Sequence, residues 1–131
     1  MDIQNAVNIL VLNAGSSSQK IALFSVDIQA ETMTSSLWEA TIEWTGEQGC
    51  GEMTIQIPGE RQLYHKTVHA GKGRAEAVID ALRALWLGET AVVTGPEQIA
   101  AVGHRVVHGG LEFRQTTRIT SAVTDAITRL I

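Results

Sequence analysis

The stretch ILVLNAGSSSQKIALFSV, residues 9–26, constrains the fold more than any other part of the chain. Residues 9–12 are all apolar, which is typical of a strand covered on both faces in the sheet of an α/β domain. Strand-forming residues resume at 20–26, after small or polar residues at 13–18. Hairpin loops usually contain about two to five residues, so this length predicts a loop that does more than reverse the chain.

The periodicity of the remaining sequence predicts further strands. Alternation at 36–46 indicates a third strand, and the turn signal Pro58-Gly59-Glu60 separates strands expected at 52–57 and 61–68. Branched residues predict another strand at 101–110, which ends in a glycine pair. The fold class expected from this pattern is α/β.

Helical spacing begins after Gly73 and is expected to end at Gly88. A short helical stretch is expected at 97–100 and a longer helix at 121–131, whose apolar face runs to the last residue. Such an ending predicts a fragment of a longer chain. The apolar stripe of the first helix comprises Val78, Ile79, Leu82, Leu85 and Trp86, and its charged face, interpreted as solvated surface, comprises Arg74, Glu76, Asp80 and Arg83.

Composition limits the classes of function. The chain has 131 residues, one domain by length, and a net charge of -4 without a basic stripe, which argues against nucleic acid as a partner. No apolar run approaches the ~20 residues of a membrane span, and the N-terminus lacks the pattern of a signal peptide, so a cytoplasmic location is expected. The single cysteine, Cys50, is interpreted as a small residue in a glycine-rich loop.

The polar stretch after the first strand is suited to bind phosphate. Gly15 allows close backbone approach, and consecutive N–H groups in a tight turn form a concave donor nest. Hydroxyl donors, a compact cation and a polar side chain at the strand end are supplied by Ser16, Ser17, Ser18, Lys20 and Asn13. A polar hairpin loop whose serines only satisfy themselves remains the alternative.

Arg105 and Val107 form a second candidate site. Because alternate strand residues share a face, these two point one way, while His104 and His108 point the other. A guanidinium fork beside an isopropyl group suits a short carboxylate, although a structural ion pair of Arg105 would also explain it. On a strand, histidines four positions apart lie ~13 Å from each other, too far to share a metal ion, and the same holds for His65 and His69.

Together, LVLNAGSSSQK and AVGHRVVHGG resemble the acetokinase family in sequence, order and separation. The resemblance implies an actin-like, ribonuclease-H-like fold, with a mixed sheet, N-terminal antiparallel strands and flanking helices. It also implies two domains, a homodimer, and reversible Mg2+-dependent phosphoryl transfer from ATP to acetate, which gives ADP and acetyl phosphate.

The resemblance assigns roles to the residues singled out above. Asn13 would lie near the magnesium-bound phosphates, and Arg105 would hold the carboxylate and the transferring phosphoryl group, with Val107 lining the methyl pocket. Leu111 stands where the family usually has an acidic residue. The phosphate-contacting loop would comprise Gly15, Ser16, Ser17, Ser18 and Lys20.

Residues 1–131 would then be the N-terminal domain, with the second domain absent from this chain and the isolated chain inactive. Propionate and butyrate kinases share both motifs, and the sequence does not decide among these substrates. A non-catalytic phosphate- or nucleotide-binding module is the alternative from another class.

Overall fold

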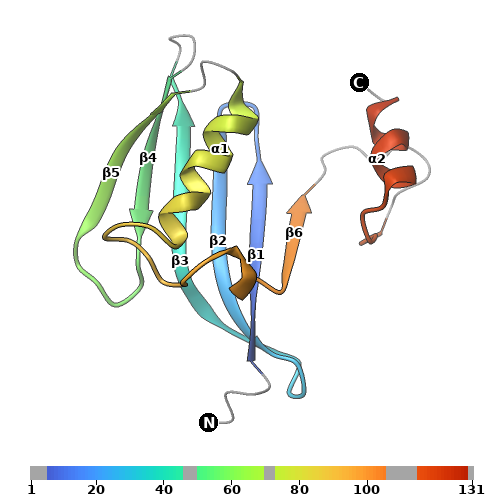
Figure 1. The fold of residues 1–131 in the computed structure, drawn as a ribbon, viewed down its shortest axis with the longest axis horizontal. Helices are drawn as coiled ribbons and strands as arrows, with labels where there is room; N and C mark the ends of the chain where they lie inside the picture. The colour runs from blue at the N-terminus through green and yellow to red at the C-terminus, as the bar shows by residue number, and fades with distance from the viewer. Residues whose placement is uncertain (1–5, 46–49, 70–72, 106–114, 130–131) are drawn as a thin grey trace.

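The computed structural model describes residues 6–45, 50–69, 73–105 and 115–129 (Figure 1). In this part of the chain, one mixed sheet has the strand order β5-β4-β3-β2-β1-β6. The strands are β1 (Ala6–Ala14), β2 (Ser18–Asp27), β3 (Thr32–Trp44), β4 (Cys50–Gln56), β5 (Leu63–His69) and β6 (Ala101–Arg105). The helices are α1 (Arg74–Leu82) and α2 (Ser121–Thr128), with 3-10 turns η2 (Arg83–Leu85) and η3 (Pro96–Gln98).

The topology combines a meander with a crossover. Strands β1 to β5 pair antiparallel in sequence order, whereas β6 joins the other side of β1 in parallel. The segment between β5 and β6 contains α1, which lies across one face of the sheet in Figure 1. Because a parallel strand needs such a crossover, this arrangement is typical of α/β proteins, and the expected class is confirmed.

Strands β1 and β2 are longer than the sequence predicts. Cross-strand pairing continues to Ala14 and Gln19, so the connecting loop contains only residues 15–17. The expected loop at 13–18 is therefore wrong at both ends, since Asn13 lies in β1 and Ser18 in β2. The polarity of these side chains hid their strand conformation, because strand pairing uses the backbone rather than the side chain.

The hydrophobic core lies between α1 and one face of the sheet, which we call the helix face. Leu23, Trp38 and Ile42 are fully buried there, and each such side chain contributes ~1.5–3 kcal/mol on burial. The opposite face is called the reverse face; Val11 and Asn13 lie on it, because they alternate along β1 with Leu10 and Leu12 of the core.

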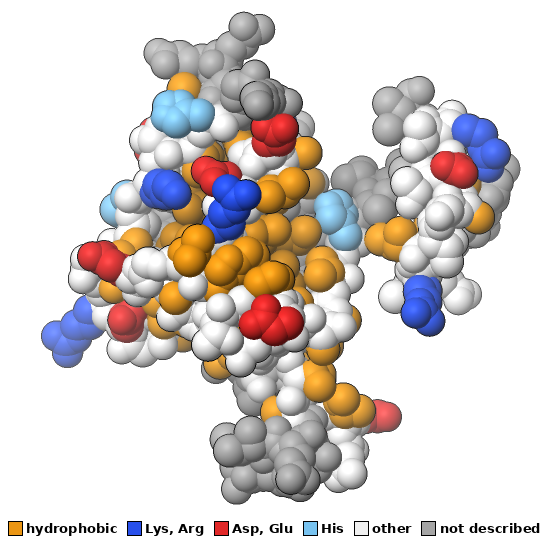
Figure 2. All heavy atoms as spheres, in the orientation of Figure 1, with side chains coloured by type: hydrophobic (Ala, Val, Ile, Leu, Met, Phe, Trp, Pro, Cys, Tyr) orange, Lys and Arg blue, Asp and Glu red, His pale blue; other side chains and the backbone are white. Residues whose placement is uncertain are grey.

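The inward side of α1 and η2 follows most of the predicted stripe, because Val78, Leu82 and Trp86 pack against the core and Leu85 is buried in it. The two differences are the exposed Ile79 and two buried alanines. Ala77 and Ala81 are buried, followed by Leu85 in η2, whereas Ile79 is 55% exposed. Small residues at this spacing allow α1 to lie close to the sheet. A search for large apolar residues does not find them. Hydrophobic side chains accordingly gather on the outer surface over α1 and the segment after it (Figure 2).

The remaining boundaries follow local chemistry. Helical structure ends at Leu85, the last residue of η2, which is three residues before the expected stop at Gly88. Gly88 itself has a φ of 82°, a conformation that favours glycine. The Thr120 hydroxyl accepts a hydrogen bond from the Val123 N–H, and α2 begins at the next residue, Ser121. None of the helices in the described ranges has the length and apolar character needed to cross a bilayer.

Candidate functional site

Three of the predicted site residues meet in one row across the sheet. Asn13 of β1 is paired with Lys20 of β2 on one side and with Arg105 of β6 on the other. Directly paired residues on adjacent strands project to the same face, with Cβ atoms ~5 Å apart in antiparallel pairs. Lys20, Asn13 and Arg105, which we call the polar row, therefore lie side by side on the reverse face.

The register also tests the orientation predicted for the last strand. His104 is paired with Leu12, which packs against the core, whereas Arg105 is paired with Asn13. The two neighbours consequently project to opposite faces, as expected from strand alternation. Val107 and His108, also assigned by alternation, lie outside the described residues.

The polar row carries two cationic side chains. Lys20 and Arg105 are exposed, Asn13 is half-buried, and neither cation forms an ion pair with any described residue. The alternative of a structural ion pair for Arg105 thus finds no partner in the described ranges. Two cations that flank a neutral amide favour an anionic ligand, and the guanidinium can bind phosphate or carboxylate in bidentate fashion.

The loop next to the row is partly closed by its own backbone. The Gly15 N–H donates to the Ser18 carbonyl at 2.8 Å, and the Trp44 N–H donates to the Ser17 carbonyl at 2.9 Å. The Gly15 N–H is therefore not available to a phosphate, so the loop has one fewer backbone donor for this ligand than expected. Within the described part of the chain, the hydroxyls of Ser16, Ser17 and Ser18 have no hydrogen-bond partner, so the self-satisfied loop is not observed.

The described residues do not build a magnesium site by themselves. They contain no group of three or more His, Cys, Asp or Glu side chains that could hold a metal ion. Asn13 offers one neutral oxygen, but Lys20 and Arg105 flank it and repel a bare cation. Mg2+ usually keeps several waters and is bound through carboxylates and substrate phosphates, so this donor set fits the phosphate better than the ion.

The structure reveals one residue near the loop that the sequence interpretation missed. Arg74, the first residue of α1, donates from Nη1 to the Ser16 carbonyl at 2.9 Å. Its guanidinium also lies over the Trp44 ring, with Cζ 5.0 Å from the ring centroid. Arg74 is exposed, as expected for a solvated helix face, but its two contacts with the loop and β3 were not expected. The sequence did contain a signal for this contact. A cation in the first turn of a helix interacts unfavourably with the helix dipole, so another contact must offset that cost.

The described histidines and Cys50 do not form a metal site with one another or with other described side chains. His65 and His69 both lie on β5, which confirms that their spacing is that of a strand, and no described group of side chains could hold a metal there. Cys50 is the first residue of β4 rather than a loop residue, which corrects its predicted position. Its Sγ lies 3.8 Å from His69 Nδ1 across the strand pair.

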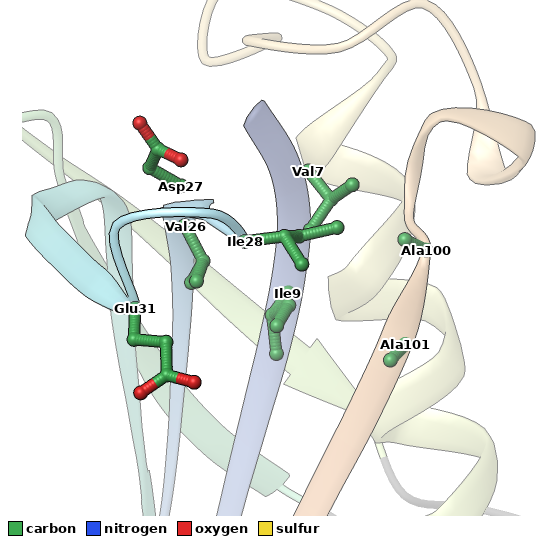
Figure 3. A pocket seen from close by; sticks show the side chains of 8 residues that line it. All are labelled: Val7, Ile9, Val26, Asp27, Ile28, Glu31, Ala100 and Ala101. Atoms are coloured by element: carbon green, nitrogen blue, oxygen red, sulfur yellow. The ribbon is translucent and has the colours of Figure 1, made fainter. Parts of the chain in front are cut away.

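A shallow apolar hollow occupies the other end of β1. Its volume is about 610 Å³, and Val7 and Ile9 line it together with Ala100 and Ala101 at the start of β6. Figure 3 shows these side chains around the hollow, with the Asp27 carboxylate pointing away from them. Ile9 precedes Asn13 by four strand positions, ~13 Å, so the hollow is separate from the polar row.

Comparison with known proteins identifies the family to which the chain belongs. A family model described as "Acetokinase family" matches residues 8–131, and the chain belongs to this family. A protein of Cyanothece sp. named acetate kinase is 43% identical over 125 residues, which is 95% of this chain and 30% of the relative.

Two other relatives, also named acetate kinase, have similar sequence identity and coverage. The protein of Gloeobacter violaceus is 40% identical over 95% of this chain and 30% of its own length, and that of Microcystis aeruginosa is 38% identical over the same shares. The chain thus spans about 30% of the length of these curated relatives. No solved structure matches the chain significantly.

Proposed function

We propose that the natural protein carrying this sequence transfers the γ-phosphoryl group of ATP to acetate, reversibly, to give ADP and acetyl phosphate. The observation that carries the proposal is the polar row, which aligns Lys20, Asn13 and Arg105 on one face of the sheet. The row lies in a chain of the acetokinase family whose relatives bear the name acetate kinase.

In this proposal Lys20 and Arg105 bind different parts of the two substrates. Lys20 and the N–H and hydroxyl donors of Ser16, Ser17 and Ser18 bind the phosphate chain of the nucleotide. Arg105 holds the acetate carboxylate and the transferring phosphoryl group, while Val107 lines the methyl pocket. Lys20 and Arg105 lie on the two strands that flank β1, so two strand spacings, about 10 Å, separate them. This distance leaves room for a phosphoryl group between donor and acceptor.

The chemistry needs no protein nucleophile. In-line phosphoryl transfer depends on the alignment of attacking and leaving oxygens and on neutralisation of charge on the equatorial oxygens. The Arg105 guanidinium orients the attacking carboxylate and offsets that charge. When bound with the nucleotide phosphates near Asn13, Mg2+ would supply further charge neutralisation.

The proposal extends to the whole protein. The order β3-β2-β1-β6, with three antiparallel strands followed by a parallel one, supports an actin-like, ribonuclease-H-like domain. Residues 1–131 would be its N-terminal domain, and a second domain would complete the active site of a cytoplasmic homodimer. The 131 residues alone would not catalyse the reaction, because the nucleotide pocket and further charged groups would be missing.

The test is acetate-dependent release of ADP by the natural protein, measured beside its intact mass. Activity in a protein well above 14.1 kDa supports the proposal, and a native mass of 14.1 kDa without activity indicates a non-catalytic phosphate-binding module instead. Parallel assays with propionate and butyrate identify the acyl chain. A kcat/KM highest for a longer acid would replace acetate with that substrate.

A further inference from the structure

Two donors bind the loop carbonyls, one from α1 and one from the end of β3. Arg74 Nη1 donates to the Ser16 carbonyl at 2.9 Å, and the Trp44 N–H donates to the Ser17 carbonyl at 2.9 Å. Arg74 is itself stacked on the Trp44 ring. The loop, the end of β3 and the first turn of α1 are thereby connected through one guanidinium.

These contacts fix the direction of the neighbouring amides. The described peptide bonds are all trans, and in a planar trans peptide the C=O and the following N–H point in opposite directions. With its carbonyl bound to Arg74, the peptide after Ser16 directs the Ser17 N–H away from α1. The described structure shows no hydrogen-bond partner for this N–H, so it is available to a ligand.

We propose that Arg74 is a positioning residue for the phosphate loop, which holds the Ser16–Ser17 peptide in the orientation that presents its N–H to the nucleotide phosphates. This inference rests on the proposed function. Arg74 acts through the loop and contacts no reacting atom. The cation remains at the unfavourable end of the helix dipole because the Ser16 carbonyl and the Trp44 ring offset that cost.

The test compares three variants of the natural protein in the ADP-release assay. Arg74→Met keeps the aliphatic stem and a good helix former but removes the donor. Arg74→Lys restores a cationic donor. Arg83→Ala is the matched control. Arg83 is the first residue of η2, its guanidinium bonds to Asp80, and it does not contact the loop in the described structure.

We expect Arg74→Met to raise KM for ATP about tenfold and to lower kcat, because a charge-assisted hydrogen bond that orients the loop is lost. KM for acetate and the melting temperature should stay close to wild type. Arg74→Lys should recover part of the KM for ATP, and Arg83→Ala should behave as wild type.

Four results would overturn the inference. Unchanged kinetics of Arg74→Met would show that the contact does not position the loop. An equal loss in Arg83→Ala, or an equal rise in both KM values, would indicate a general effect on α1. An inactive wild type would remove the proposed function and this inference with it, whereas an active wild type with a silent Arg74→Met removes the inference alone.

Discussion

Replacement of Gly51 by alanine tests how the sheet supports the loop. A Cβ atom at this position of β4 would lie 2.9 Å from Cε3 and 3.1 Å from Cζ3 of the Trp44 ring, and 3.0 Å from Cγ2 of Ile42. All three distances are shorter than ordinary van der Waals contacts. Ile42 is fully buried, and Trp44 is held beneath Arg74, so neither side chain moves freely.

The expected cost follows from this crowding. Extra methyl groups in a packed site typically destabilise by about 1–3 kcal/mol, because side chains and backbone must shift. For a domain of this size, that corresponds to a fall in melting temperature of roughly 4–10 °C. Displacement of Trp44 would also loosen Arg74, so KM for ATP should rise in the same variant.

The matched control is Gly103→Ala in β6, where an added Cβ would meet nothing within 4 Å. This variant should melt within about 1 °C of wild type or slightly above it, since alanine reduces the entropy of the unfolded chain. Both proteins are compared by thermal unfolding followed by circular dichroism. Equal melting temperatures for the Gly51 and Gly103 variants would refute the packing argument.

Three further changes test other parts of the account. Arg105→Lys should lower kcat about 100-fold in the ADP-release assay with no change in melting temperature, because a point charge does not replace the guanidinium fork at an exposed position; retained activity would contradict this role. Leu23→Ala, at a fully buried position, should reduce the free energy of unfolding in urea by about 2–5 kcal/mol, and a loss below 1 kcal/mol, about the cost of a mild core change, would contradict its place in the core. Burial raises the pKa of the Tyr64 phenol, and the carboxylates of Glu60 and Glu89 raise it further. The unfolded chain then loses this proton first, so stability should fall as pH rises from about 10 through the folded pKa; a pH dependence of melting unchanged in Tyr64→Phe would contradict that assignment.

The sequence predicts all six strands of the described sheet but few of their ends. Apolar runs and turn residues indicated the five strands of the meander, because side-chain periodicity reports burial. Side-chain type alone predicts a loop at Asn13, Ala14 and Ser18, because the backbone pairing of β1 with Gln19 and Lys20 does not depend on side-chain polarity. For α1, the buried positions are alanines, whose small size identifies close packing only once the sheet is known.

The candidate site was predictable in its parts and not in its arrangement. Alternation along one strand correctly separated His104 from Arg105. The pairing of Asn13 with both Lys20 and Arg105 depends on strand order and register, which join residues about ninety positions apart in the sequence. Arg74 was missed for the same reason, because its contact with Ser16 spans 58 positions.

The central claim is that the polar row receives the transferring phosphoryl group. It is tested most directly by a crystal structure of the natural protein with acetate and a non-hydrolysable ATP analogue. The account predicts the terminal phosphate on the reverse face, between Lys20 and Arg105, with the Ser17 N–H directed at the phosphate chain. A terminal phosphate on the helix face, or one without contact to either cation, would contradict it.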